Sequence, residues 1–120
     1  MDLGVWMTRG VLAHKRQTGE RRTQAWNLKA LPDELSRSPE PHRLFVAVDG
    51  RWRGYFVLKP WVHRNPRDPA APWTLVFDAD TWTAVEPEAA PPRDRTAGYT
   101  LDVPQPTFTT EKRNEIDRDI

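Results

Sequence analysis

The feature that most constrains the fold is a β-hairpin signal in the middle of the chain. Residues 43–48 form an aromatic and β-branched run that is typical of a strand. Asp49-Gly50 follows, and this pair favours a two-residue type I′ turn because glycine accepts a positive φ. Residues 51–59 then predict the partner strand, which Gly54 interrupts. A glycine inside a strand marks a bulge or a bend, and such bends help a sheet curl into a barrel.

Alternation along this hairpin predicts which side chains are buried together, because successive residues of a strand point to opposite faces. The positions predicted to share its core face are Leu44, Val46, Val48, Trp52, Phe56 and Leu58. Arg51 and Arg53 alternate with this set, so they are predicted to point outward. The run 44–48 is apolar without interruption, which favours a strand that is buried on both faces.

Short segments elsewhere predict the remaining elements. Strands are predicted over residues 4–8, 73–77, 81–85 and 98–103, and a strand or an extended crossing segment over 23–28. A short helix is predicted over 9–18 with Gly19 as its C′ residue, and a single helical turn over 31–35. Proline-rich loops are predicted over 60–72 and 86–96.

These elements predict a single mostly β (α+β) domain over residues 1–103, followed by a flexible polar tail over 104–120. About six short strands, with one or two short helices near the N-terminus, favour a small β-barrel. Twelve prolines against six glycines argue against long helices.

Composition excludes several classes of chemistry. The chain has no cysteine, which rules out disulfides, thiolate metal sites and cysteine nucleophiles. Its three histidines lie in three segments without ligand spacing, so neither a metal nor another cofactor is expected. No apolar run approaches the ~20 residues that span a bilayer, and the N-terminus has no signal-peptide pattern. A soluble, cytoplasmic protein without a membrane partner is therefore expected.

Charge is distributed unevenly along the chain. Residues 1–64 contain twelve Lys and Arg against six Asp and Glu, whereas residues 65–120 contain six against eleven. This division predicts either a basic binding face with an acidic tail, or two halves that interleave in the fold so that their fields cancel.

The basic half contains a cationic segment with interleaved tryptophans. It holds Arg9, His14, Lys15, Arg16, Arg21, Arg22 and Lys29, with Trp6 and Trp26 nearby. Clustered Lys and Arg bind phosphates, and aromatic side chains are stacking platforms for unpaired bases. The segment therefore indicates nucleic-acid binding. The alternative is a solvated basic helix beside tryptophans that belong to the core.

Ten residues are predicted to contact the nucleic acid. They are Arg9, Lys15, Arg21, Arg22, Thr23, Gln24, Trp26, Arg51, Arg53 and Trp61. In this interpretation the cations contact phosphates, Thr23 and Gln24 hydrogen-bond a base or a sugar, and Trp26 or Trp61 stacks on a base.

A hydrolytic site has little support in the sequence. No nucleophile-elbow or phosphate-loop motif is present. Thr23 beside Arg22 is the catalytic candidate, since a threonine with a basic neighbour could activate water or polarise a carbonyl. Arginine stays protonated in proteins, however, and is a poor general base.

The motif over residues 18–24 resembles the signature of ASCH domains of the PUA-like superfamily. Gly19, Arg22, Thr23 and Gln24 match its run of Gly, basic residue, Thr and Gln, with one extra residue between the Gly and the Thr. The order of the later segments is also similar, over about residues 4–103. The resemblance implies a small β-barrel with helices beside a cleft that binds RNA or a modified nucleoside.

Some members of that family look like amidohydrolases of acetylated cytidine that use a Lys, a Thr and a Glu. In this chain the Lys position holds Arg22, or Arg21 in the ungapped alignment, and Trp26 replaces an Arg that often ends the motif. No carboxylate is assigned to the role of the Glu. The resemblance therefore implies Thr23 and Arg22 as cleft residues, without a catalytic assignment.

The sequence thus predicts a domain that binds RNA or another nucleic acid in a basic cleft, with a modified base among the expected ligands. Two alternatives remain open. One is a protein-interaction regulator whose surface is the loop 60–72 and the acidic second half. The other is a small hydrolase that acts on a modified nucleoside. The oligomeric state is left open.

Overall fold

The structure is a computed structural model that describes residues 1–17, 23–38 and 41–104. In chain order its elements are β1 (Asp2–Trp6), α1 (Arg9–Lys15), β2 (Thr23–Leu28), η1 (Asp33–Ser36), β3 (Arg43–Val48), β4 (Arg51–His63), β5 (Trp73–Asp78), η2 (Ala79–Thr81) and β6 (Thr83–Ala89). The mostly β prediction is confirmed. The predicted C′ residue Gly19 and nearly all of the predicted tail lie outside the described residues.

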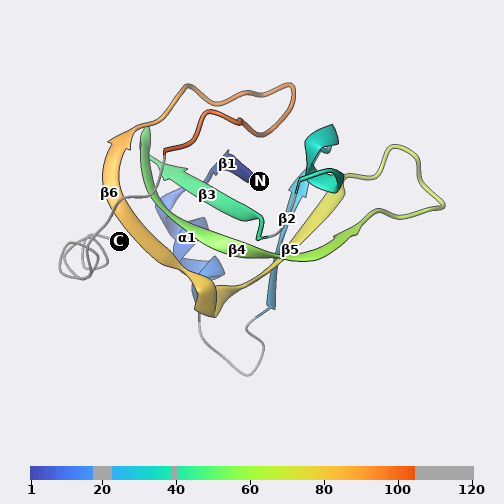
Figure 1. Ribbon diagram of the computed structural model, residues 1–120, viewed down its shortest axis with the longest axis horizontal. Helices are drawn as coiled ribbons and strands as arrows, with labels where there is room; N and C mark the ends of the chain where they lie inside the picture. The colour runs from blue at the N-terminus through green and yellow to red at the C-terminus, as the bar shows by residue number, and fades with distance from the viewer. Residues whose placement is uncertain (18–22, 39–40, 105–120) are drawn as a thin grey trace.

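The six strands form one curved sheet in the order β1-β3-β4-β5-β2, with β6 paired to β4 off this path. β1 and β3 are parallel, and every other pairing is antiparallel. The long strand β4 pairs with β3, β5 and β6, and Figure 1 shows it sweeping across the molecule. Within the described residues the path ends at β1 and β2 without closing.

The hairpin prediction is confirmed at its turn and corrected at its second strand. Asp49 and Gly50 both have positive φ, 52° and 77°, as a type I′ turn requires. In β4, Trp52 pairs with Ala47 and Gly54 pairs with Val46, so one extra residue lies between them. This bulge moves Trp52 to the face opposite Phe56, contrary to the prediction that the two share a face, because a one-residue insertion reverses the alternation.

The sheet buries apolar side chains on both faces. The inner core is formed by Leu3, Val5, Met7, Leu12, Leu28, Leu35, Leu44, Val46, Val48, Phe56, Leu58, Leu75, Phe77 and Trp82. The outer core is formed by Phe45, Ala47, Trp52 and Val85. Members of both cores alternate along β3, which confirms that this strand is buried on both faces. In the inner core the ring of Phe56 lies 4.4 Å from that of Phe77 and 4.8 Å from that of Trp82, between centroids.

Helix α1 lies against the inner core. Thr8 caps it, since its Oγ1 accepts a hydrogen bond from the backbone N–H of Val11 at 3.2 Å. Leu12 is its buried residue, and the guanidinium of Arg16, just after the helix, lies 5.2 Å from the ring centroid of Trp82. The helix ends at Lys15, three residues earlier than predicted. No helix among the described residues is long and apolar enough to cross a membrane.

The register of β1 against β3 is fixed by an ion pair at its start. Asp2 lies opposite Arg43, and its two carboxylate oxygens accept hydrogen bonds from Nε and Nη2 of Arg43 at 2.7 and 2.6 Å. The hydrogen bonding to Asp2 raises the pKa of Arg43. A two-pronged contact of this kind fixes geometry as well as adding attraction.

Three predicted boundaries are wrong. The predicted loop 60–72 begins only after His63, because β4 continues to that residue, and the second loop begins after Ala89. Residues 98–103 do not form a strand but make an isolated bridge, with hydrogen bonds of 2.8 and 2.9 Å between the backbones of Gly4 and Thr100. Gly98 has a φ of 82°, which turns the chain out of the extended conformation just before this bridge.

Candidate functional site

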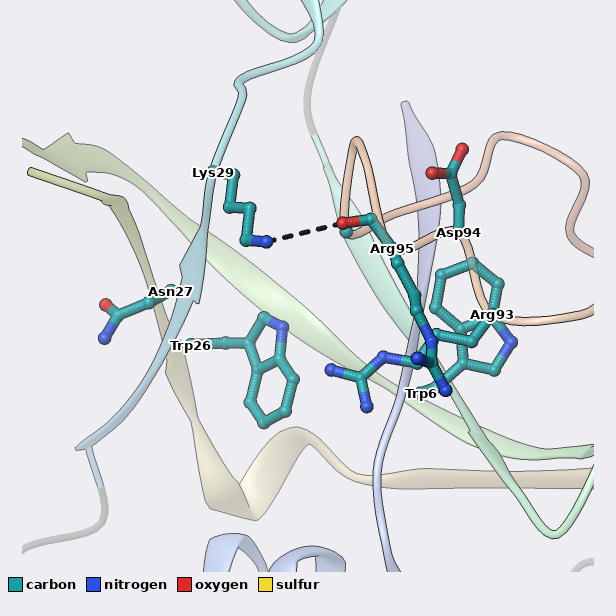
Figure 2. Close-up of a pocket in the computed structure, with 8 residues that line it drawn as sticks. Trp6, Trp26, Asn27, Lys29, Arg93, Asp94 and Arg95 are labelled. Atoms are coloured by element: carbon teal, nitrogen blue, oxygen red, sulfur yellow. Dashed lines mark hydrogen bonds between the residues drawn. The ribbon is translucent and has the colours of Figure 1, made fainter. Parts of the chain in front are cut away.

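A pocket of about 340 Å³ lies between β1, β2 and the turn that follows β6. Figure 2 shows it from the side of β2, with a tryptophan from each of these two strands. Its lining residues are Trp6, Trp26, Asn27, Lys29, Arg93, Asp94, Arg95 and Gly98. Its volume is at the small end of the range typical of ligand pockets. β1 and β2 are the two ends of the strand path, so the pocket occupies the opening of the curved sheet.

Trp6 is held at the end of β1 from both sides. Its indole packs against the outer core, and its Nε1 donates a hydrogen bond to the carbonyl oxygen of Pro91 at 2.9 Å. The indole is thus half-buried, with its polar atom satisfied by the segment that leads into the turn.

Trp26 is held from the side of β2 and α1. It packs against the inner core, and the Nζ of Lys15 lies 5.8 Å from its ring centroid. The same Nζ donates a hydrogen bond to the carbonyl oxygen of Ala25 at 2.6 Å. Partial burial lowers the pKa of Lys15, because removal from water disfavours the charged amine. The ring therefore sits beside a fixed positive charge.

Three cations face the space between the two indoles. In Figure 2 the guanidinium groups of Arg93 and Arg95 lie between the rings, and Lys29 reaches across from β2. The Nζ of Lys29 is 3.4 Å from the carbonyl oxygen of Arg95, to which it donates. Within the part of the chain that the structure describes, none of the three forms an ion pair with a carboxylate.

Asp94 does not neutralise these cations. Its Oδ1 accepts hydrogen bonds from the backbone N–H groups of Thr96 and Ala97, each at 2.9 Å, and this builds the turn. Figure 2 shows its carboxylate directed away from the two guanidinium groups. The pocket therefore combines aromatic surface with a net positive charge.

The structure brings together part of the predicted set of contacts. Trp26 lines the pocket, and Lys15 lies against its ring. Trp6 and Lys29, from the wider cationic segment, also line the pocket. Gln24 is on the same face of β2 as Trp26 but pairs with Phe77, farther along the strand. Arg9, Arg51 and Arg53 do not line the pocket.

Other predicted residues fall elsewhere. Thr23 is exposed on the face of β2 opposite Trp26, because the two are three positions apart in a strand. Its place gives no support to a catalytic role in this pocket. Arg21 and Arg22 lie outside the described residues, and so does the side chain of Trp61.

Sequence reasoning missed the residues of the turn. Arg93, Arg95 and Gly98 come from the acidic half. The net negative charge of that half gives no indication of a cationic site formed by single arginines. The available signal was local: two arginines flank an aspartate that favours a turn, directly after two prolines. Because these arginines meet Lys29 of the basic half, the two halves do interleave at this site.

Two further side chains are held by local hydrogen bonds. Asn27 lines the pocket through its backbone side, since its amide oxygen points away and accepts a hydrogen bond from Thr74 at 2.9 Å (Figure 2). Asp78 caps η2, since its Oδ1 accepts a hydrogen bond from the backbone N–H of Asp80 at 3.0 Å. In the described ranges no group of three or more histidine or acidic side chains could hold a metal ion.

We compared the chain with family models, with curated proteins and with solved structures, and no match was found in any of the three. The chemistry of the pocket is therefore what indicates a function for this protein.

Proposed function

We propose that this protein binds single-stranded nucleic acid, RNA in the first instance, in the pocket between Trp6 and Trp26. One observation carries the proposal: two indoles and three cations without acidic partners in the described chain meet in one pocket. A ligand that matches both features has a flat aromatic ring and a negative charge. An unpaired nucleotide has both.

The chemistry of binding follows from the positions of the side chains. A base inserts against an indole, where stacking contributes about 1–3 kcal/mol per base without strong sequence preference. Its phosphate is bound by Arg93 and Arg95, whose guanidinium groups can each donate two parallel hydrogen bonds. Lys29 adds a further point charge. A duplex is disfavoured, because its bases are already stacked and paired and do not enter a pocket of this size.

We further infer that the curved sheet belongs to the PUA-like β-barrel type and that the chain is related to ASCH domains. The support is the likeness of residues 18–24 to the ASCH motif, together with the approach of β1 and β2 around one pocket. The test is an experimental structure of the protein. Strands β1 and β2 that diverge, with no shared cleft, would argue against this assignment.

The proposal is tested by fluorescence anisotropy with labelled single-stranded RNA, duplex RNA and single-stranded DNA at several salt concentrations. Contacts from three cations predict that log K falls against log[salt] with a slope of about −2 for a single strand. Removing two of them in Arg93→Ala/Arg95→Ala reduces the magnitude of that slope to about 0.7. Trp26→Ala lowers the affinity with little change in slope, since it removes stacking and no charge.

The matched control is Arg67→Ala, which removes one exposed positive charge outside the pocket. We expect its affinity to stay within about twofold of the wild type. Absence of binding at low salt refutes the proposal. So does an Arg93→Ala/Arg95→Ala protein that is folded by circular dichroism and retains full affinity.

A further inference from the structure

A third tryptophan, Trp73, is a diagonal neighbour of the pocket residue Trp26 and belongs to neither core. It is half-buried at the start of β5. An indole has a large flat apolar face and a polar N–H, so a half-buried tryptophan can pack on one side and present the other side to a ligand. The position of Trp73 is therefore compatible with a role in binding.

The strand register places Trp73 on β5 across from β2, the strand that supplies Trp26 and Asn27 to the pocket. It pairs with Leu28, which lies between the pocket residues Asn27 and Lys29. Trp26 pairs with Leu75, so Trp26 and Trp73 are diagonal neighbours on one face of the β2–β5 pair. Diagonal neighbours have Cα atoms about 7–8 Å apart, within reach of one ligand for large aromatic side chains.

The side chain of Arg64 is held against the ring of Trp73. The guanidinium carbon of Arg64 lies 4.9 Å from the ring centroid of Trp73. The same guanidinium donates a hydrogen bond to the carbonyl oxygen of Pro69, which holds it over the ring. Arg64 is itself exposed, so the plane of its guanidinium is open to a ligand. Unpaired bases stack on guanidinium planes as well as on aromatic rings, and a side chain already held in place loses less entropy on binding.

We propose that Trp73 and Arg64 form a second stacking subsite, which receives the nucleotide adjacent to the one in the pocket. This inference rests on the proposed function and makes it more specific: the ligand is an unpaired strand of at least two nucleotides. A mononucleotide occupies the pocket alone. A longer strand places a base on Arg64 and Trp73 and its phosphate near the same guanidinium.

The test compares a nucleoside monophosphate with a six-nucleotide single-stranded RNA, by competition against a labelled six-nucleotide RNA. The wild type is expected to bind the six-nucleotide RNA more tightly than the monophosphate. Loss of one stacked base predicts an affinity for that RNA about five- to 150-fold lower in Trp73→Ala and in Arg64→Ala. Neither variant changes the affinity for the monophosphate. Arg64 is exposed, so its replacement keeps the test valid if Trp73→Ala does not fold.

Arg67→Ala is the matched control, because Arg67 is exposed in the same loop and is not stacked on any ring that the structure describes. A loss in Arg67→Ala equal to that in Arg64→Ala overturns the subsite, since general attraction by the loop then explains both. Full affinity of Trp73→Ala and Arg64→Ala for the six-nucleotide RNA overturns it too, while the proposed function stands. If the wild type binds neither ligand, the proposed function fails and the subsite with it.

Discussion

Replacement of Gly54 by alanine tests the close pairing of β4 and β6 at the bulge. Gly54 lies in β4 opposite Ala84 of β6. A Cβ atom at this position would lie 2.5 Å from the backbone oxygen of Thr83 and 2.5 Å from the ring of Trp82. Real Cβ atoms essentially never approach other heavy atoms within 3.0 Å, so one side of the contact has to move.

Neither neighbour moves easily. The oxygen of Thr83 is part of the backbone at the start of β6, so its displacement shifts the strand. The ring of Trp82 is 8% exposed and is enclosed by Phe56 at 4.8 Å and Arg16 at 5.2 Å. Overpacking of this kind costs about 1–3 kcal/mol. The lower chain entropy of alanine in the unfolded state offsets roughly 0.5–1 kcal/mol of this cost.

Gly54→Ala is therefore expected to lower the free energy of unfolding by about 1–2 kcal/mol. For a domain of this size, such a change lowers the Tm by roughly 4–8 °C. The matched control is Gly10→Ala in α1, where a Cβ atom meets nothing within 4 Å. Gly10→Ala should stabilise the protein by about 0.5–1 kcal/mol, because alanine is a better helix former than glycine.

Thermal unfolding followed by circular dichroism, with urea unfolding as a second measure, separates the two variants. A Tm for Gly54→Ala at or above that of the wild type, alongside a stabilised Gly10→Ala, refutes the close packing of Gly54 against Thr83 and Trp82. Destabilisation of both variants by the same amount would refute it as well, since the effect would then not depend on the contacts of Gly54.

Two further predictions concern the inner core and a partly buried charge. Phe56→Ala removes a fully buried ring that stacks on Phe77 and packs at a tilt against Trp82, so urea unfolding should give a loss of about 3–5 kcal/mol. A loss below about 1 kcal/mol contradicts this packing. For Lys15, the folded pKa lies below its usual value of 10.5, so the unfolded chain binds more protons between these two pH values. Stability should therefore rise with pH through that window in the wild type and rise less in Lys15→Met, as measured by urea unfolding; equal slopes contradict the burial of the amine.

Local signals were sufficient to predict the elements but not their edges. The turn at Asp49-Gly50 and the strand that precedes it follow directly from residue type, because positive φ and β-branching act within a few residues. Gly54 correctly marked an irregularity. What it could not reveal is that Arg53 is the inserted residue, since that depends on where β3 and β6 pair with β4.

The strand predicted over residues 98–103 failed for a related reason. Its sequence favours a strand, but a strand also needs a partner with free hydrogen-bonding groups along its length. β1 offers this segment the backbone of Gly4 alone. The segment instead crosses the outer core, where Val103 packs. Partner availability is a property of the whole sheet and is not present in a window of six residues.

The candidate site was half predictable for the same physical reason. Trp26, Lys15 and Lys29 lie close together in the chain, so their clustering shows in the sequence. Arg93 and Arg95 join them because the segment after β6 folds back along the outer core to Trp6. Such long-range approach depends on topology, and only the folded chain establishes it.

The opening of the sheet explains why the pocket forms at this place. An end strand exposes unpaired backbone groups, and proteins protect such strands with charged side chains, lysine above all. Lys15 does this for β2 by donating to the carbonyl oxygen of Ala25. Protection of the edge does not, however, require Arg93 and Arg95, which make no hydrogen bond to β2 through their side chains within the described residues.

Protection of the β2 edge and binding of a ligand are therefore separate roles for these cations. If the cations served only to protect the edge, the residues nearest the backbone of β2 would be enough, and the turn would have no reason to direct two guanidinium groups between two indoles. Arg93 and Arg95 are exposed, so water screens much of their mutual repulsion, and an anion placed between them relieves what remains. The direction of both guanidinium groups toward the indoles is therefore the stronger reason to expect a negatively charged ligand in the pocket.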